Sequence, residues 1–107
     1  MIDLKKMQKE VIQNKINHGF NTTDISMEFC LANGELGEAY IAWLKKKDDV
    51  GEELADVAIY LLGISEILNI NLEKEIKNKI EKNKKRVYKP DKNGVLLKVE
   101  ELYGKEK

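Results

Sequence analysis

The sequence predicts an all-α protein, a four-helix bundle followed by a short irregular C-terminal tail. Apolar residues recur at spacings of three and four through most of the chain, which is the period of an amphipathic helix. Apolar residues make up 42% of the sequence and charged residues 36%, a balance typical of a globular protein rather than a disordered one. The length of 107 residues suggests one domain, with a helical core over about residues 3–88 and a tail over 89–107.

The first helix is expected over about residues 3–17, where Leu4, Met7 and Val11 share one face. Gly19 is a candidate C-terminal cap. The loop that contains it carries one titratable ring, His18, and one aromatic side chain, Phe20. The simplest interpretation of this loop is a helix cap and a core plug, and the alternative is a place in a functional site.

The second and third helices are expected to form an antiparallel hairpin. The second begins near three capping candidates, Thr22, Thr23 and Asp24, continues through Asn33-Gly34 and ends near Lys46. A short charged turn over residues 45–49 leads into the third helix, over about residues 49–68. This third helix is apolar on nearly its whole circumference, which predicts a central position and a further apolar surface that a second copy of the chain covers.

The fourth helix is expected over about residues 72–87, and Pro90 ends regular helix. Residues 91–94 carry a turn signal. Residues 95–99 are expected to be extended, and residues 100–103 to form a frayed helical turn.

Composition excludes several classes of protein. The 19 Lys and Arg residues balance the 19 Asp and Glu residues, so there is no global positive field to attract a nucleic acid polymer. The single cysteine, Cys30, cannot form an internal disulfide and is expected to be an inert core residue. One Cys and one His make a zinc site a poor fit. The N-terminus has no signal-peptide pattern and the longest apolar run, residues 57–63, is too short for a membrane span, so we expect a soluble cytoplasmic protein.

Two acidic pairs dominate the hairpin. Glu35 and Glu38 lie on its first arm, Glu53 and Asp56 on its second, and residues spaced i,i+3 share a helix face. A hairpin folded at Lys47 places residue 38 level with residue 56, with residue 53 within about a turn of both. Four converging carboxylates predict a site for Mg²⁺ or Mn²⁺. Acidic pairs are also common on solvated helix faces, and spacing alone leaves both interpretations open.

A basic line follows on the fourth helix. Lys79, Asn83 and Arg86 are spaced i, i+4 and i+7 beside its apolar stripe. One hypothesis is a phosphate clamp that faces the acidic site. The other is a solvated basic face, which is the usual meaning of such a run.

These motifs together resemble those of the MazG-like nucleotide pyrophosphohydrolases, the all-α NTP pyrophosphatases. The shared pattern is Glu-x-x-Glu, fourteen residues and Glu-x-x-Asp, followed by Lys-x-x-x-Asn and Arg-x-Tyr and preceded by His-Gly-Phe. The resemblance covers about residues 15–90. It implies a helical fold that assembles as a homodimer or a dimer of dimers. It also implies Mg²⁺-dependent hydrolysis of a nucleoside triphosphate to the monophosphate and pyrophosphate.

The resemblance also implies residue roles. The metal ligands and catalytic carboxylates would be Glu35, Glu38, Glu53 and Asp56, with Glu38 a candidate to orient or deprotonate the attacking water. The substrate would contact six further residues: Lys79, Asn83, Arg86, Tyr88, His18 and Phe20. Many relatives have Pro between the Arg and the Tyr, where this chain has Val87. The pathway suggested is cleansing of the nucleotide pool.

Two other interpretations stay open. Phosphoribosyl-ATP pyrophosphohydrolases share the helical acidic scaffold, although their surrounding motifs match this chain less well. In a different class, the chain is a catalytically silent helical dimer that binds nucleotides or proteins as a regulator.

Overall fold

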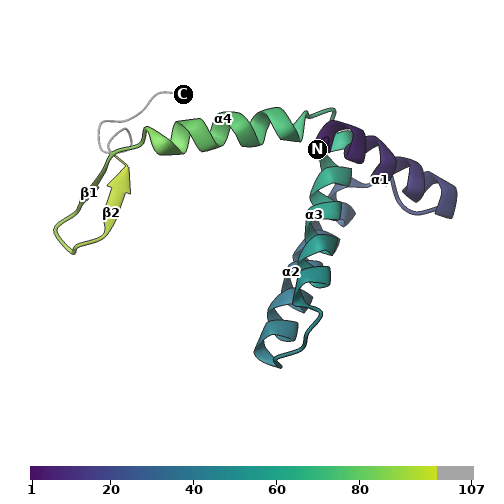
Figure 1. Ribbon diagram of the computed structural model, residues 1–107, viewed down its shortest axis with the longest axis horizontal. Coiled ribbons are helices and arrows are strands. Elements are labelled where there is room, and N and C mark those ends of the chain that lie inside the picture. Colours follow the sequence, from purple (N-terminus) through teal and green to yellow (C-terminus); the bar gives the residue numbers. More distant parts are fainter. Residues whose placement is uncertain (99–107) are drawn as a thin grey trace. The chain divides into compact units, whose positions relative to one another are not determined.

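A computed structural model describes residues 1–98 of the chain (Figure 1). Four helices are followed by a pair of short strands: α1 (Leu4–His18), α2 (Ile25–Leu44), α3 (Val50–Ile67), α4 (Leu72–Lys84), β1 (Tyr88–Pro90) and β2 (Leu96–Lys98). The all-α prediction is therefore confirmed, as is the order of the helices. The chain divides into two compact units, Met1–Glu73 and Lys74–Lys107.

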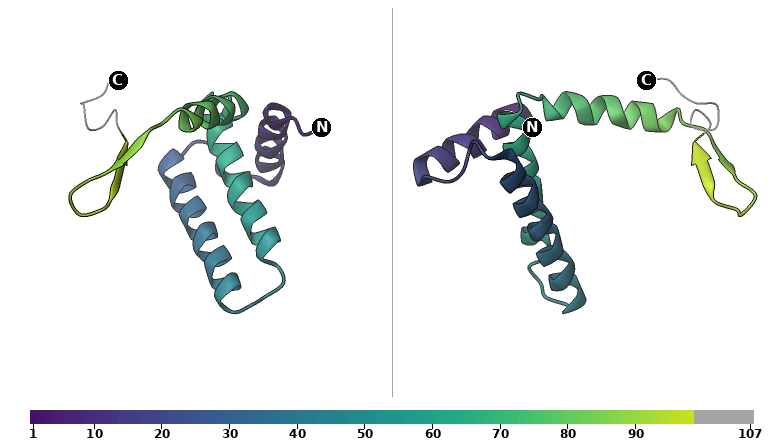
Figure 2. Two further views of the ribbon diagram at one scale, coloured as in Figure 1. Left: turned by 60° about the vertical axis from the view of Figure 1, so that its left-hand side comes forward. Right: turned by 180° about the vertical axis from the view of Figure 1, so that it is seen from behind.

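The first unit is an antiparallel α2–α3 hairpin with α1 packed against α3 (Figure 2). Because α3 contacts both of the other helices, its predicted central position is confirmed. Gly63 permits the close approach of α1, since a Cβ atom built there would lie 3.3 Å from Cγ1 of Val11. No helix within residues 1–98 combines the length and apolar character needed to cross a membrane.

Local capping explains where the first two helices begin and end. Asp3 and Asp24 each accept a hydrogen bond from a backbone N–H three residues on, which fixes the first turns of α1 and α2. Gly19 ends α1 in the left-handed conformation at φ 73°, as predicted. Helix α2 is continuous through Asn33-Gly34 and ends at Leu44, after which Lys46 takes a positive φ of 55°.

The interior of this unit combines small apolar residues with buried polar ones. Alanines on α2 at positions 32, 39 and 42 are buried, and small side chains allow two helices to approach closely. The most deeply buried larger side chains are Gln8 and Glu28. Gln8 donates to the Glu66 carboxylate and to the Ile70 carbonyl, and it accepts from the N–H of Leu72, so it ties α1 to the turn between α3 and α4.

Three details differ from the sequence prediction. Helix α4 ends at Lys84 rather than at residue 87, because Tyr88 leaves the helix to pair with Lys98 in an antiparallel hairpin. The tail thus begins with paired strands, close to the extended segment expected at 95–99, and the turn expected at 100–103 lies outside the described residues. Cys30 is exposed, because it lies on the side of α2 opposite its buried alanines.

Candidate metal centre

Three of the four predicted carboxylates come together on the hairpin. Glu35 and Glu38 on α2 and Glu53 on α3 each offer an oxygen, and these oxygens lie within 4.8 Å of one another. The antiparallel pairing of the two arms produces this arrangement, since each arm alone contributes carboxylates only one turn apart. Asp56 is half-buried one turn further along α3.

The electrostatics of this cluster are unfavourable for a metal-free protein. Partial burial raises the pKa of Glu35, and the charges of Glu38, Asp56 and Glu53 raise it further. Burial also raises the pKa of Glu53, followed by the charges of Asp49, Asp56, Glu38 and Glu52. Asp56 therefore acts on both of these carboxylates, although its own oxygens are not among the three that meet. A bound cation relieves this mutual repulsion.

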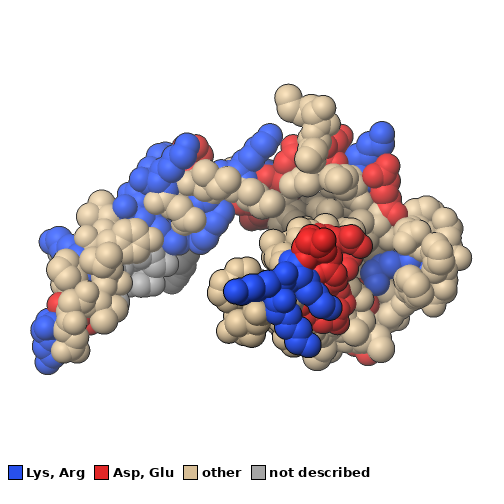
Figure 3. Space-filling view, turned by 60° about the horizontal axis from the view of Figure 1, so that its bottom comes forward, with Lys and Arg blue, Asp and Glu red and all other residues tan. Residues whose placement is uncertain are grey.

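A cavity of about 160 Å³ lies beside the cluster, lined in part by Glu38, Asp49, Glu53 and Lys47. Figure 3 looks toward the tip of the hairpin, where acidic and basic side chains lie next to one another. Within residues 1–98, Oδ1 of Asp49 and Oε1 of Glu53 are buried and have no hydrogen-bond partner. Burying a carboxylate oxygen without a partner lowers the stability of the folded protein unless a cation or a hydrogen-bond donor contacts it.

Asp49 is the residue at this site that the sequence analysis missed. It occupies the N-cap position of α3, yet its side chain makes no capping hydrogen bond. An Asp just before a helix normally indicates an N-cap, so the position of Asp49 in the sequence gives no reason to expect it at a metal site. The available signal was its spacing, because Asp49 precedes Glu53 by four residues and shares its helix face.

The donor set fits a hard divalent cation. All of the converging atoms are carboxylate oxygens, which Mg²⁺ and Mn²⁺ prefer over softer ligands. The buried oxygens without partners lie at the same place. These residues therefore suit the predicted metals.

The predicted phosphate-binding residues belong largely to the second unit. Lys79 and Asn83 lie on α4, whereas Arg86 follows the helix and Tyr88 begins β1. The expectation that Arg86 continues a helical line is wrong, because the chain leaves the helix after Lys84. The N–H of Arg86 instead donates to the carbonyl of Asn83 in a tight final turn.

The last residue of α1 and the loop after it place two rings together. The rings of His18 and Phe20 stack with centroids 5.5 Å apart, and Nδ1 of His18 lies 2.9 Å from the Asn14 carbonyl. Phe20 is 57% exposed, so the core-plug interpretation is wrong. Phe20 instead lines a cavity beneath α1, whereas His18 is not among the residues that line it.

Comparison with known proteins adds one solved structure. No protein-family model and no curated protein matches the sequence. A cyanophage S-2L MazG-like pyrophosphohydrolase, solved with dGDP and three catalytic Mn²⁺ ions per active site, superposes with a TM-score of 0.65. The match covers 92% of this chain and 98% of that one at 21% sequence identity. The chain therefore has the MazG-like fold.

Proposed function

We propose that the chain is a metal-dependent nucleoside triphosphate pyrophosphohydrolase, which converts an NTP or dNTP and water to the monophosphate and pyrophosphate. The observation that carries this proposal is the meeting of Glu35, Glu38 and Glu53 from two helices within 4.8 Å. The MazG-like fold supports it, since the structure that shares the fold is described as a pyrophosphohydrolase with a nucleotide and Mn²⁺ bound.

Glu35, Glu38, Glu53 and Asp56 would hold Mg²⁺ or Mn²⁺. When bound, these ions supply Lewis-acid stabilisation of the charge that develops on the phosphates. Glu38 is the exposed member of the cluster, so water reaches it most readily, and we assign it the task of orienting the water and accepting its proton. Asp49 adds a fifth carboxylate at the edge of the cluster.

The basic residues that follow would bind the phosphates. Lys79 and Arg86 neutralise the charge that accumulates on pyrophosphate as it leaves, and Asn83 and Tyr88 add hydrogen-bond donors. Arg offers a planar fork of N–H groups that matches two phosphate oxygens at once. The physiological role that fits such an activity is removal of unwanted nucleotides from the pool.

We further propose that the working form contains a second copy of the chain. Leucines 54, 61 and 68 follow one another at intervals of seven along α3 and its C-cap, and each is about half exposed. Phe29, Leu36 and Trp43 form a second exposed line of the same spacing on α2. Two long apolar stripes on one hairpin are typical of a helical interface.

The test is a panel of NTPs and dNTPs incubated with Mg²⁺ or Mn²⁺, with the products separated by ion exchange. We expect monophosphate and pyrophosphate in equal amounts from the wild type, and none from Glu38→Gln. The control is Glu52→Gln, an exposed acid next to Glu53, which should retain turnover within a few-fold. Diphosphate and phosphate as products, or nucleotide binding without turnover, would overturn the proposal.

A further inference from the structure

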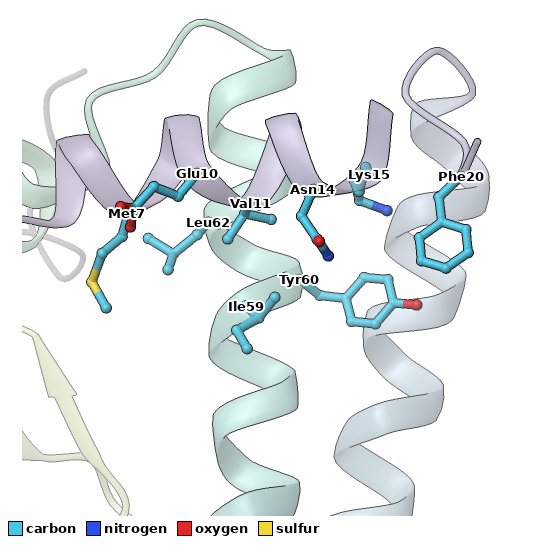
Figure 4. Close-up of a pocket in the computed structure, with 9 residues that line it drawn as sticks. All are labelled: Met7, Glu10, Val11, Asn14, Lys15, Phe20, Ile59, Tyr60 and Leu62. Carbon is cyan, nitrogen blue, oxygen red and sulfur yellow. The ribbon is translucent and has the colours of Figure 1, made fainter. Parts of the chain in front are cut away.

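The first unit contains a second, larger cavity that the proposed hydrolysis has not used. It lies beneath α1, against α3, and has a volume of about 410 Å³ (Figure 4). That volume lies within the range of small-molecule sites, roughly 300–1,000 Å³. Met7, Val11 and Leu62 give one end an apolar lining.

The other end of this cavity carries aromatic and polar groups. Asn14 and Lys15 come from α1, Tyr60 comes from α3, and Phe20 follows from the loop after α1. In Figure 4 the Asn14 amide and the Lys15 ammonium point toward the Tyr60 ring, with the ring of Phe20 beyond them. Two aromatic rings beside hydrogen-bonding groups suit a flat heterocycle, whose faces stack and whose edge carries donors and acceptors.

A buried network holds the Lys15 ammonium in place. Its Nζ atom lies 2.9 Å from Oε1 of Glu28, which is fully buried, and 5.4 Å from the centre of the Tyr60 ring. The other oxygen of Glu28 accepts a hydrogen bond from the Asn21 amide. The Lys15 side chain is only 11% exposed, so its position is defined by these contacts. An ammonium has three N–H donors, which leaves donors for a ligand in the cavity.

The cavity and the acidic cluster share one helix. Tyr60 follows Asp56 by four residues and Glu53 by seven, so the three lie on one face of α3, separated by about 6 Å and about 10 Å of helix rise. One nucleotide would then lie along this face of α3, with its base in the cavity and its phosphates at the cluster. The two places differ in chemistry. The carboxylates of the cluster suit a metal-bound polyphosphate, whereas the cavity adds Glu10, Asn14 and Lys15 to its apolar and aromatic lining, and these groups suit the donors and acceptors on the edge of a ring.

We propose that the cavity beneath α1 is the base site and that Lys15 makes it selective for bases with a carbonyl group at position 6 of a purine or position 4 of a pyrimidine. Lys15 can only donate hydrogen bonds, so it favours a carbonyl oxygen over an amino group at the same ring position. The preferred substrates are then triphosphates of guanine, hypoxanthine, uracil and thymine rather than adenine. This inference rests on the proposed function for the triphosphate, but its test does not need turnover.

The test uses the monophosphates of hypoxanthine and adenine, whose rings differ in the 6-position carbonyl or amino group and the proton on the adjacent nitrogen. Calorimetric titration of the wild type should give tighter binding of the hypoxanthine nucleotide by about tenfold or more, the scale of one charge-assisted hydrogen bond. The double variant Lys15→Met, Glu28→Gln removes both buried charges together and should bring the ratio close to one. Lys9→Met, an exposed lysine on the same helix, should leave the ratio unchanged.

Phe20→Ala provides a variant at an exposed position, so its fold does not depend on a buried charge. It should weaken binding of both nucleotides by a similar factor through the loss of stacking. Equal binding of the two nucleotides by the wild type overturns the base site, as does a double variant that keeps the preference. The two proposals separate cleanly: selective binding without hydrolysis rejects the function alone, and hydrolysis without selectivity rejects the base site alone.

Discussion

The charged form of Glu53 is disfavoured both by burial and by the negative charges of its neighbours. Burial raises its pKa above the ordinary value of 4.5, and four neighbouring carboxylates raise it further. Between the pKa of the unfolded chain and the higher pKa of the folded one, the folded state binds more protons. The free energy of unfolding of the metal-free protein therefore falls as pH rises through this window, and the whole penalty is present above it.

The substitution Glu53→Gln removes this titration. Relative to the wild type, the metal-free variant should gain free energy of unfolding as pH rises from about 4.5, and it should gain little below that value. Urea denaturation at several pH values with a chelator present measures the difference. Glu75→Gln, on α4, is the control and should show no such trend. A constant difference between Glu53→Gln and the wild type at all pH values would contradict the electrostatic account.

Asp56 contributes charge to the cluster without adding an oxygen to the group of three. Asp56→Ala removes repulsion on Glu35 and Glu53, so the metal-free melting temperature should hold or rise. The gain in melting temperature from Mg²⁺ or Mn²⁺ should shrink, because binding to the folded state stabilises by mass action. Thermal melts with and without metal measure both effects, and the control is Asp48→Ala in the exposed hairpin turn. An unchanged metal response in Asp56→Ala would exclude Asp56 from the site.

At the scale of the elements, Gln8 links α1 to the turn between α3 and α4. Its amide makes hydrogen bonds of 3.1 Å to Glu66, 2.8 Å to the Ile70 carbonyl and 2.9 Å from the Leu72 N–H. Gln8→Ala leaves these groups unsatisfied and should lower the free energy of unfolding by about 1–3 kcal/mol. Gln13→Ala, an exposed glutamine on the same helix, should change it by less than about 0.5 kcal/mol. Equal effects in denaturant titrations would mean that this link does not stabilise the unit.

The segment after α4 tests the phosphate-binding hypothesis. If Arg86 binds the leaving pyrophosphate, Arg86→Ala should reduce kcat/KM by roughly tenfold to a thousandfold, and Arg86→Lys should recover only part of it. Lys82→Ala, from the same basic run, should leave kcat/KM unchanged. Similar kinetics for Arg86→Ala and Lys82→Ala would show a solvated basic surface instead.

The helices that could be predicted are those whose ends are defined by residues close to them in the sequence. Periodicity and caps such as Asp24 and Gly19 lie within a few residues of the helix ends that they define, so α1 and α2 were predicted closely. The end of α4 was predicted three residues too late, because it depends on pairing between Tyr88 and Lys98, ten residues apart. Strand pairing of that kind has no signature in helical periodicity.

The candidate site shows the same division. The acidic pairs could be predicted because i,i+3 spacing is visible within a few residues of sequence. The geometry of an antiparallel hairpin then predicted that the two pairs lie close together. The burial of Lys15 and Glu28 as an ion pair could not be predicted from the sequence. A charged residue on a helix is normally solvated, and only tertiary packing brings these two side chains together. A lone acid within the apolar start of α2 was the one available sign.

At the scale of the whole molecule, the exposed stripes on α2 and α3 predict self-association. Leu61→Asp places a charge in the middle of the α3 stripe, where the side chain is 46% exposed and outside the isolated unit's core. The variant should shift the wild-type dimer or tetramer toward monomer, or aggregate. Ile2→Asp, an exposed apolar residue outside both stripes, should not change the mass. Light scattering at micromolar concentration measures the mass, and a monomeric wild type would contradict the interface.

We propose that the carboxylates of the hairpin direct water to the α-phosphorus of a triphosphate. Hydrolysis in ¹⁸O-labelled water, followed by mass spectrometry of both products, tests this most directly. We expect one labelled oxygen in the monophosphate and none in the pyrophosphate, with no label incorporated by Glu38→Gln. Label in the pyrophosphate or in free phosphate, or equal labelling by the variant, would contradict it.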